Sequence, residues 1–177
     1  MLRIRAATPA DVPALCELIP RSARALSRGY YSEPLIESAI LHVFGPDSRL
    51  IDDGTYFAAE EGGRLVGCGG WSRWQTLYGG DQMKAPTDSK LDPETEPARI
   101  RAFFVHPDCA RRGIGTRILQ ACIDGAREAG FRRVTLASTL PGVPFYRALG
   151  FEEREAIEVP LPDGLKLPVI RMEKDVD

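Results

Sequence analysis

The sequence has few of the residues that build metal sites and disulfide frameworks. It contains only two histidines, His42 and His106, and four cysteines in 177 residues. No two cysteines stand in a Cys-x-x-Cys pair, which is the spacing of many structural zinc sites and of redox dithiols. We therefore expect reduced thiols, no disulfide framework and no bound metal.

The chain also lacks long apolar runs and an excess of charge. No stretch approaches the roughly 18 consecutive apolar residues that a membrane-spanning helix needs. Residues 2–6 alternate between apolar and charged side chains, unlike the apolar core of a secretory signal. The formal net charge is −2, so the basic excess typical of nucleic-acid-binding proteins is missing. These absences predict a cytoplasmic protein that binds neither a membrane nor nucleic acid.

What the chain does contain is typical of one globular domain. Hydrophobic residues make up 44% of it and charged residues 27%, which are ordinary proportions for a folded protein. A chain of 177 residues with this content can bury a sizeable core. We therefore expect a single domain over residues 1–177.

The order of the expected elements indicates a mixed sheet. Hydrophobic periodicity and turn signals predict strands over 2–6, 55–61, 64–74, 98–105, 132–138, 151–160 and 166–172. They predict helices that begin at 9, 33, 113 and 141. Because strands occur both as hairpins and as β-α-β units, the predicted fold class is α/β (α+β), with a mixed, mainly antiparallel central sheet flanked by helices.

The segment 75–97 differs from its surroundings because it is polar and contains three prolines. A loop of this length inside a compact domain is usually functional or mobile. We expect this segment to be mobile or to face a bound acceptor.

The segment 103–116 joins an apolar strand to a long helix through a basic loop that contains glycine. The first amides of a helix have no partners within the helix, and the helix dipole makes that end electropositive. Gly113 and Gly115 leave no side chain in the path of an approaching anion. The segment therefore predicts an anion cradle suited to a pyrophosphate.

Two familiar phosphate-binding motifs do not fit this cradle. A P-loop requires Gly-Lys-Ser/Thr, whereas Gly115 is followed by Thr116 and Arg117. A Rossmann fingerprint requires a third glycine, at a position where this chain has Ile118. The pattern by itself also leaves open a glycine-rich turn that holds no ligand.

The same segment resembles the acetyl-CoA-binding motif of the GNAT acetyltransferases, Gln/Arg-x-x-Gly-x-Gly/Ala. About thirty residues later, 146–151 match the second signature of that family, Tyr-x-x-Leu-Gly-Phe, and residues 4–11 resemble its first strand and helix. The resemblance covers nearly the whole chain. It departs from the motif at Ala110, which stands in the Gln/Arg position and is followed by Arg111 and Arg112.

By this resemblance the chain is an acetyl-CoA-dependent N-acetyltransferase with a GNAT-like fold, in which a splayed pair of strands binds acetyl-CoA as co-substrate. The pantetheine arm would pair with the strand before the cradle, and the pyrophosphate with the cradle amides. The resemblance implies direct attack of a primary amine in a ternary complex. It assigns acetyl-CoA contacts to Phe103, Phe104, Val105, Arg111, Arg112, Gly113, Ile114, Gly115 and Thr116.

The resemblance also assigns the catalytic acid. It makes Tyr146 the proton donor to the departing thiolate, and a phenol with an ordinary pKa near 10 is protonated at neutral pH. The strands where relatives carry a basic glutamate offer no carboxylate here. The general base stays open between a water relay, direct attack by a neutral amine, and four side chains: His106, Glu60, Glu61 and Glu96.

The acceptor pocket is expected between the loop after the first helix and the central strands. Arg99 and Arg101 share one side of their strand. If that side faces the cleft, the acceptor carries a carboxylate or phosphate; if it faces outward, the arginines form a solvated stripe. The aromatic candidates for acceptor contact are Tyr30, Tyr31, Trp71 and Trp74.

The sequence does not identify the acceptor among an amino acid, a polyamine, an antibiotic and a peptide N-terminus, and it leaves a homodimer open. Two other functions compete with acetyl transfer. The first is a non-catalytic acyl-CoA-binding module that senses or regulates, which the missing carboxylate favours. The second is a nucleotide-binding Rossmann domain.

Overall fold

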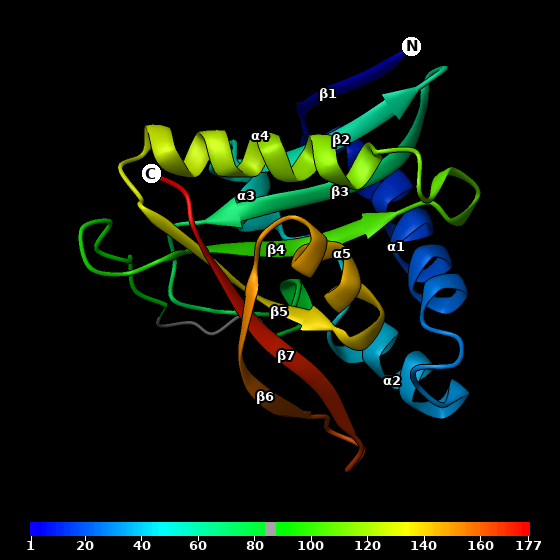
Figure 1. Cartoon of the computed structure of the whole chain (residues 1–177). Helices are drawn as coiled ribbons and strands as arrows, with labels where there is room; N and C mark the ends of the chain where they lie inside the picture. The colour runs from blue at the N-terminus through cyan, green and yellow to red at the C-terminus, as the bar shows by residue number, and fades with distance from the viewer. Residues whose placement is uncertain (84–87) are drawn as a thin grey trace.

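The computed structural model describes residues 1–83 and 88–177, and within these residues the strands form one seven-stranded sheet (Figure 1). The strands are β1 (Leu2–Ala6), β2 (Tyr56–Glu61), β3 (Arg64–Ser72), β4 (Ala98–Val105), β5 (Arg133–Thr139), β6 (Glu152–Pro160) and β7 (Lys166–Asp175). Their order in the sheet is β1-β2-β3-β4-β5-β7-β6. Neighbouring strands are antiparallel except β4 and β5, which are parallel. The predicted mixed, mainly antiparallel sheet is confirmed, and a doubly wound parallel sheet of the Rossmann type is excluded.

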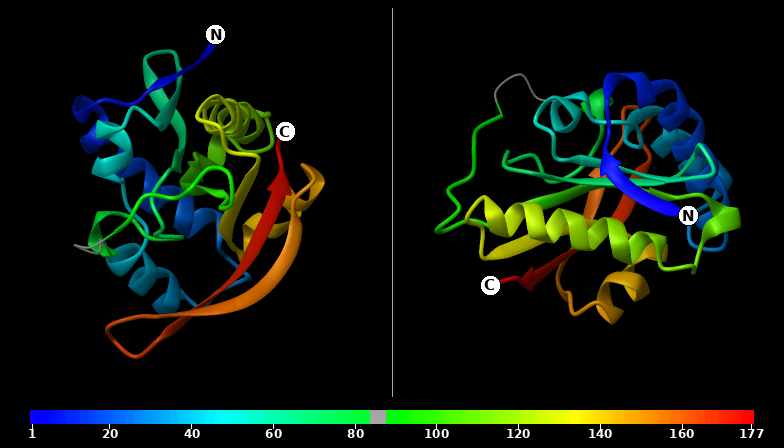
Figure 2. Two further views of the ribbon diagram at one scale, coloured as in Figure 1. Left: turned by 90° about the vertical axis from the view of Figure 1, so that its left-hand side faces the viewer. Right: turned by 90° about the horizontal axis from the view of Figure 1, so that it is seen from above.

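Helices cover both faces of this sheet. The helices are α1 (Val12–Leu26), α2 (Glu33–His42), α3 (Ser48–Asp52), α4 (Ile114–Glu128) and α5 (Val143–Ala148). Figure 2 shows α4 and α5 on one face and α1, α2 and α3 on the other. The sheet is therefore the middle layer of the molecule, with apolar packing on both of its sides.

The packing of α4 follows from its sequence. Its apolar residues recur every three or four positions, which places them on one side of the helix. That side is buried against the sheet through Ile114, Ile118, Leu119, Cys122, Ile123 and Ala126. All four cysteines of the chain are free thiols, and Cys16 is the exposed one.

The structure adds one helix that the sequence pattern did not predict. Helix α3 has five residues, which is too short for an apolar periodicity to be recognised. Asp47 caps it, because its carboxylate accepts hydrogen bonds from the N–H groups of Arg49 and Leu50 at 3.1 and 3.3 Å. The start of α3 also contacts the segment that follows β3, because the N–H of Ser48 donates to the Asp81 carboxylate at 3.0 Å.

Several predicted boundaries are also shifted. β3 ends at Ser72 and not at 74. Just after the strand end, the N–H of Trp74 donates a hydrogen bond to the Ser72 hydroxyl at 3.0 Å. β7 extends to Asp175 and not to 172, because it pairs with β5 as far as Arg133. Tertiary pairing therefore lengthens a strand beyond its apolar run.

β4 and β5 diverge after a short parallel contact. They pair only through Ala98 with Val134 and Arg99 with Thr135. Farther along β4, Ala102 has a φ of 51° and the register with β3 shifts, which marks a bulge. The last residues of β4 therefore pair with β3 on one side, and on the other side they do not pair with β5. This is the expected splayed pair.

The long connection from β3 to β4 is irregular in its described part, apart from a short 3₁₀ turn at Asp81–Met83. Leu91 is buried, and its N–H donates to the Arg73 carbonyl at 2.7 Å. Residues 77–80 line the cavity described below, and that this part faces an acceptor stays a prediction. The expectation for 84–87 lies outside the described residues.

In the part of the chain that the structure describes, none of the helices combines the length and the apolar character needed to cross a membrane.

Candidate active site

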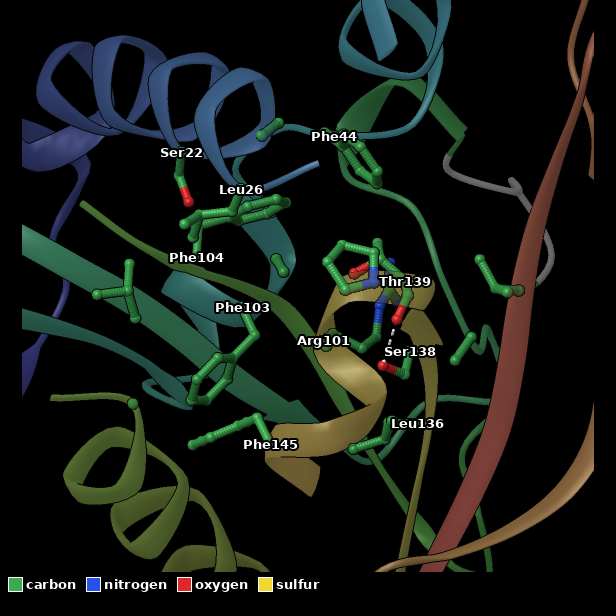
Figure 3. A pocket seen from close by; sticks show the side chains of 18 of the residues that line it. Ser22, Leu26, Phe44, Arg101, Phe103, Phe104, Leu136, Ser138, Thr139 and Phe145 are labelled. Carbon is green, nitrogen blue, oxygen red and sulfur yellow. Dashed lines mark hydrogen bonds between the residues drawn. The ribbon is translucent and has the colours of Figure 1, made fainter. Parts of the chain in front are cut away.

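A cavity of about 730 Å³ lies where β4 and β5 diverge (Figure 3). The start of α4 and helix α5 form one wall, and the end of α1 with residues 77–80 forms another. Side chains of β6 and β7 complete the lining. This volume falls within the usual range for sites that bind small molecules and cofactors.

The start of α4 contributes unpaired backbone amides to the cavity. Gly113 precedes the helix with a φ of 78°, a left-handed conformation that suits glycine. The first backbone amide of α4 with a partner is that of Arg117, which donates to the Gly113 carbonyl at 3.1 Å. Among the described residues, the N–H groups of Ile114, Gly115 and Thr116 have no backbone partner. With the helix dipole, these donors suit an anionic group.

Most of the predicted acetyl-CoA contacts line this one cavity. Those that do are Phe103, Phe104, Val105, Arg111, Gly113, Ile114, Gly115 and Thr116. Arg112 does not: its guanidinium turns to the Glu61 carboxylate, at an N–O distance of 3.0 Å. The expected contact of Arg112 with the phosphates is therefore not supported by its position.

Gly115 is the position at which a side chain is expected to obstruct the cradle. A Cβ built there would lie 3.1 Å from Cζ of Phe145, so α4 and α5 are packed too closely for a branched residue. We expect Gly115→Val to displace Phe145 and narrow the cavity, and to weaken CoA binding tenfold or more, by about 1.4 kcal/mol. Calorimetric titration with CoA measures this loss.

The control for this change is Gln120→Val, which adds the same β-branched side chain to α4 at an exposed position outside the cavity lining. Because that position lies away from the cavity, the variant should bind CoA nearly as well as the parent protein. Unchanged CoA affinity in a folded Gly115→Val protein would show that the cradle assignment is wrong.

Tyr146 reaches the same cavity from α5. Its ring packs on Phe103, Phe145 and Phe151 with centroid separations of 6.1, 5.0 and 5.5 Å. Tyr146 belongs to the cavity lining, and no residue in the described part of the chain forms a hydrogen bond with its hydroxyl. Burial raises the pKa of Tyr146 well above its ordinary value, so the hydroxyl stays protonated at neutral pH. Tyr146 can therefore donate a proton or a hydrogen bond into the cavity.

Arg101 borders the cavity from β4 and forms a buried ion pair with Asp47. Its Nη2 lies 3.0 Å from Oδ2 of Asp47, and the two side chains are only 6% and 4% exposed. Nη1 also donates to the Thr76 carbonyl at 3.4 Å, and Nη2 to the Gly79 carbonyl. Burial lowers the pKa of Arg101, and the Asp47 carboxylate counteracts this effect. The pair joins β4 to the start of α3 and to the long connection.

Arg99 lies on the same side of β4 but outside the cavity. Its guanidinium donates to the carbonyls of Gln75 and Pro97 at 3.3 and 2.8 Å. The two arginines therefore do not act as one pair, as both alternatives from the sequence assumed. Arg101 faces the cleft with its charge already paired, and Arg99 holds the long connection.

The two tyrosines that were predicted to contact the acceptor lie in different surroundings. Tyr30 lines the mouth of the cavity and is 52% exposed. Tyr31 is outside the lining, and its hydroxyl is engaged on both sides. It donates to the Pro168 carbonyl at 2.5 Å and accepts from the Leu140 N–H at 2.9 Å. Tyr31 thus ties the segment after α1 to β7 and does not line the cavity.

The two predicted acceptor tryptophans are also placed elsewhere. Trp71 is in the core on the α4 side, with its ring 6.0 Å from that of Phe131. Trp74 donates from its indole N–H to the Asp53 carboxylate at 2.8 Å, and the Arg49 guanidinium lies 4.5 Å above its ring. Neither residue lines the cavity. Their aromatic character reflects packing, which a sequence pattern does not distinguish from a binding role.

The side chains considered for a general base all lie outside the cavity lining. His106 is buried beside α1, where Nδ1 accepts from the N–H of Asp108 at 3.1 Å and Nε2 lies 3.4 Å from Nη1 of Arg21. The three glutamates are engaged elsewhere: Glu60 with Arg5, Glu61 with Arg112, and Glu96 with the backbone N–H of Asp92. Of the open alternatives, a water relay and attack by a neutral amine are the two that need no side chain from this lining.

The structure brings hydroxyl side chains into the cavity that sequence analysis missed. Ser22 and Ser27 come from the end of α1 and the residue after it, and Ser138 and Thr139 come from the end of β5. In Figure 3, Ser138 and Thr139 lie together, and the Ser138 hydroxyl donates to the Thr139 carbonyl at 2.7 Å. These residues are far apart in the sequence and belong to no local motif, so no sequence signal marked them.

Within 1–83 and 88–177, histidine, cysteine and acidic side chains nowhere gather in a group of three or more that could hold a metal ion.

Comparison with known proteins gives similarities of sequence and of fold. The sequence model of the acetyltransferase (GNAT) family matches residues 20–151. Over 66 residues, or 36% of the chain, the sequence is 39% identical to an uncharacterized N-acetyltransferase of Methanocaldococcus jannaschii. That match spans 29% of the length of the archaeal protein.

Two solved structures share the fold over almost the whole chain. A GCN5-related N-acetyltransferase from Rhodopseudomonas palustris superimposes with a TM-score of 0.71 at 21% identity, covering 99% of this chain and 94% of the other. The PaiA N-acetyltransferase from Thermoplasma acidophilum, in complex with coenzyme A, gives 0.67 at 18% identity, with 99% of both chains covered. At these identities the likeness concerns the fold.

Proposed function

The chain belongs to the GNAT acetyltransferase family, and from this premise we propose that it transfers the acetyl group of acetyl-CoA to a primary amine of a small molecule or peptide. The observation that carries the proposal is that one cavity joins three features. They are the unpaired amides of α4, the free edge of β4 and the protonated hydroxyl of Tyr146.

The residues present fit acetyl-CoA, which supplies the acetyl group as a thioester. The amides at 114–116 and the side chain of Arg111 would hold the pyrophosphate. A Cβ at Gly113 would meet no atom within 4 Å, so the approach to these amides is open. The free edge of β4 at 103–105 offers backbone groups to the amides of the pantetheine arm.

The remaining residues support direct attack by the acceptor. The amine would enter past Tyr30, which is at the mouth of the cavity. Tyr146 is the proton donor for the sulfur that leaves. The aromatic rings around Tyr146 restrict water near that sulfur, which favours proton transfer from the phenol over transfer from solvent.

The test is release of free thiol from acetyl-CoA in the presence of amino acids, polyamines, amine-bearing antibiotics and short peptides. We expect release that depends on at least one amine class, together with an acetylated product detected by mass spectrometry. A folded protein that binds CoA yet releases thiol with none of these classes would support the non-catalytic acyl-CoA sensor. That alternative is favoured by one observation, the lack of acidic residues in the described lining.

A further inference from the structure

The acceptor side of the cavity is lined by hydroxyl groups and by one guanidinium whose charge is already paired. The hydroxyls belong to serine, threonine and tyrosine, and the guanidinium is that of Arg101. No aspartate or glutamate occurs in the described lining. The four residues outside the described part, 84–87, are Lys-Ala-Pro-Thr in the sequence and add no acid either.

This lining is unfavourable for a cationic acceptor. An ammonium group that enters the cavity loses hydrating water, which by itself lowers the pKa of an amine. Among the residues that the structure describes, the charged side chains of the lining are Arg101 and Arg111, both positive. The nearest carboxylate to Arg101, that of Asp47, is bound to it at 3.0 Å and is not in the lining. The cavity therefore favours the uncharged form of an amine.

The rest of the acceptor side is apolar. Leu26 and Tyr30, at the mouth of the cavity, are 40% and 52% exposed, so their side chains are accessible to an entering molecule. Deeper in, Phe44 and Phe104 meet edge to face with centroids 5.5 Å apart, and the side chain of Val169 adds a further apolar surface. An apolar group attached to the amine would cover these surfaces.

On the basis of the proposed function, we infer that the acceptor is a weakly basic primary amine on an apolar body, bound in its uncharged form. The nitrogen lone pair forms a bond to the thioester carbonyl carbon. The carbon–sulfur bond then breaks with its electron pair on sulfur, which takes the proton of Tyr146. One proton leaves the nitrogen for water, and Tyr146 regains one from solvent, so the products are an amide and a thiol.

This inference also accounts for the missing general base. A neutral amine needs no deprotonation before attack, so a cavity without a carboxylate or histidine is sufficient. The basicity of the amine then decides the rate. At pH 7, on the order of one molecule in 2,500 of an alkylamine is neutral, against about one in 7 of an α-amine beside a carbonyl.

The experiment compares phenylalaninamide with 2-phenylethylamine, which share an aromatic body and differ in basicity by about 2.5 pKa units. Because the stronger base is also the better nucleophile, its higher reactivity offsets part of the disadvantage of its smaller neutral fraction. We expect kcat/KM at pH 7 to favour phenylalaninamide by at least about tenfold. For phenylethylamine, kcat/KM should rise about tenfold per pH unit up to pH 9, whereas for phenylalaninamide it should level off near pH 8.

A variant with an added carboxylate tests the cause of this preference. Ser22 lies in the acceptor side of the cavity and is buried on α1 (Figure 3). Ser22→Asp supplies a partner for an ammonium, and Ser22→Asn adds nearly the same volume without charge. We expect the preference for phenylalaninamide to narrow at least about threefold in Ser22→Asp and not in Ser22→Asn. An equal preference in the two folded variants would contradict the inference.

The outcomes separate this inference from the proposed function. If phenylethylamine is used as well as phenylalaninamide at pH 7, or its kcat/KM does not rise with pH, the neutral-amine inference is overturned while acetyl transfer stands. If neither these probes nor any amine class releases thiol from a protein that binds CoA, the proposed function fails, and this inference fails with it.

Discussion

Tyr146→Phe is expected to lower the turnover of acetyl transfer by about 100-fold while leaving CoA affinity within about twofold of the parent value. The change removes one oxygen and keeps a ring that packs on three phenylalanines. A positioned acid typically contributes 10²–10⁴-fold. Because a thiol of pKa about 8.5 leaves moderately well without help, the loss should fall near the low end of that range.

Turnover with saturating amine and acetyl-CoA measures this loss, and calorimetry with CoA serves as its control. Because burial raises the pKa of Tyr146, its active protonated form persists to a higher pH than that of an exposed tyrosine. Turnover of the parent protein should therefore not fall through ionisation of Tyr146 between about pH 7 and 9. Parent-like turnover of Tyr146→Phe, with chemistry rate-limiting, would remove the acid role and leave Tyr146 as a packing residue.

Asp47→Asn is expected to lower the free energy of unfolding by about 3–5 kcal/mol, because it leaves the buried Arg101 cation without its counter-charge. Asparagine is a good helix cap, so the start of α3 should keep its hydrogen bonds. For a chain of this size, such a loss lowers Tm by roughly 6–20 °C. Urea unfolding measures the free energy and a thermal scan measures Tm.

Two control variants show whether the buried charge is the cause. Adding Arg101→Met to Asp47→Asn removes the stranded cation and should restore part of the stability. Glu37→Gln breaks the exposed ion pair of Arg24 and Glu37, where both side chains are more than half exposed, and should have a far smaller effect. Equal losses for Asp47→Asn and Glu37→Gln would contradict a special role for the buried pair.

The elements that were predicted well are those whose cause is local. β4 has the predicted bounds, because an apolar run between a polar loop and Pro107 defines it. The start of α4 was expected at Gly113 and is found at Ile114, with Gly113 as its cap. Helix α3 was missed because its five residues are too few to show a helical repeat of apolar side chains. Its cap, Asp47, is a single residue and does not by itself mark a helix.

For the candidate site, the sequence by itself predicted the cradle, and the resemblance of 146–151 to the family signature predicted a role for Tyr146. Backbone amides at a helix start and a tyrosine in a short signature depend on neighbours along the chain, so a local pattern contains them. In the structure, both line the same cavity.

Only the tertiary structure decided which of the other polar and aromatic residues reach the cavity. Tyr31, Trp71 and Trp74 lie elsewhere because strands and helices distant in the sequence supply their partners. Arg101 on β4 meets Asp47, the cap residue of α3, and serines from the α1 and β5 regions line the same cavity. A strand pattern gives the side of a residue but not what covers that side. What covers it depends on packing between segments far apart in the chain, and here that packing decided which charged side chains line the cavity.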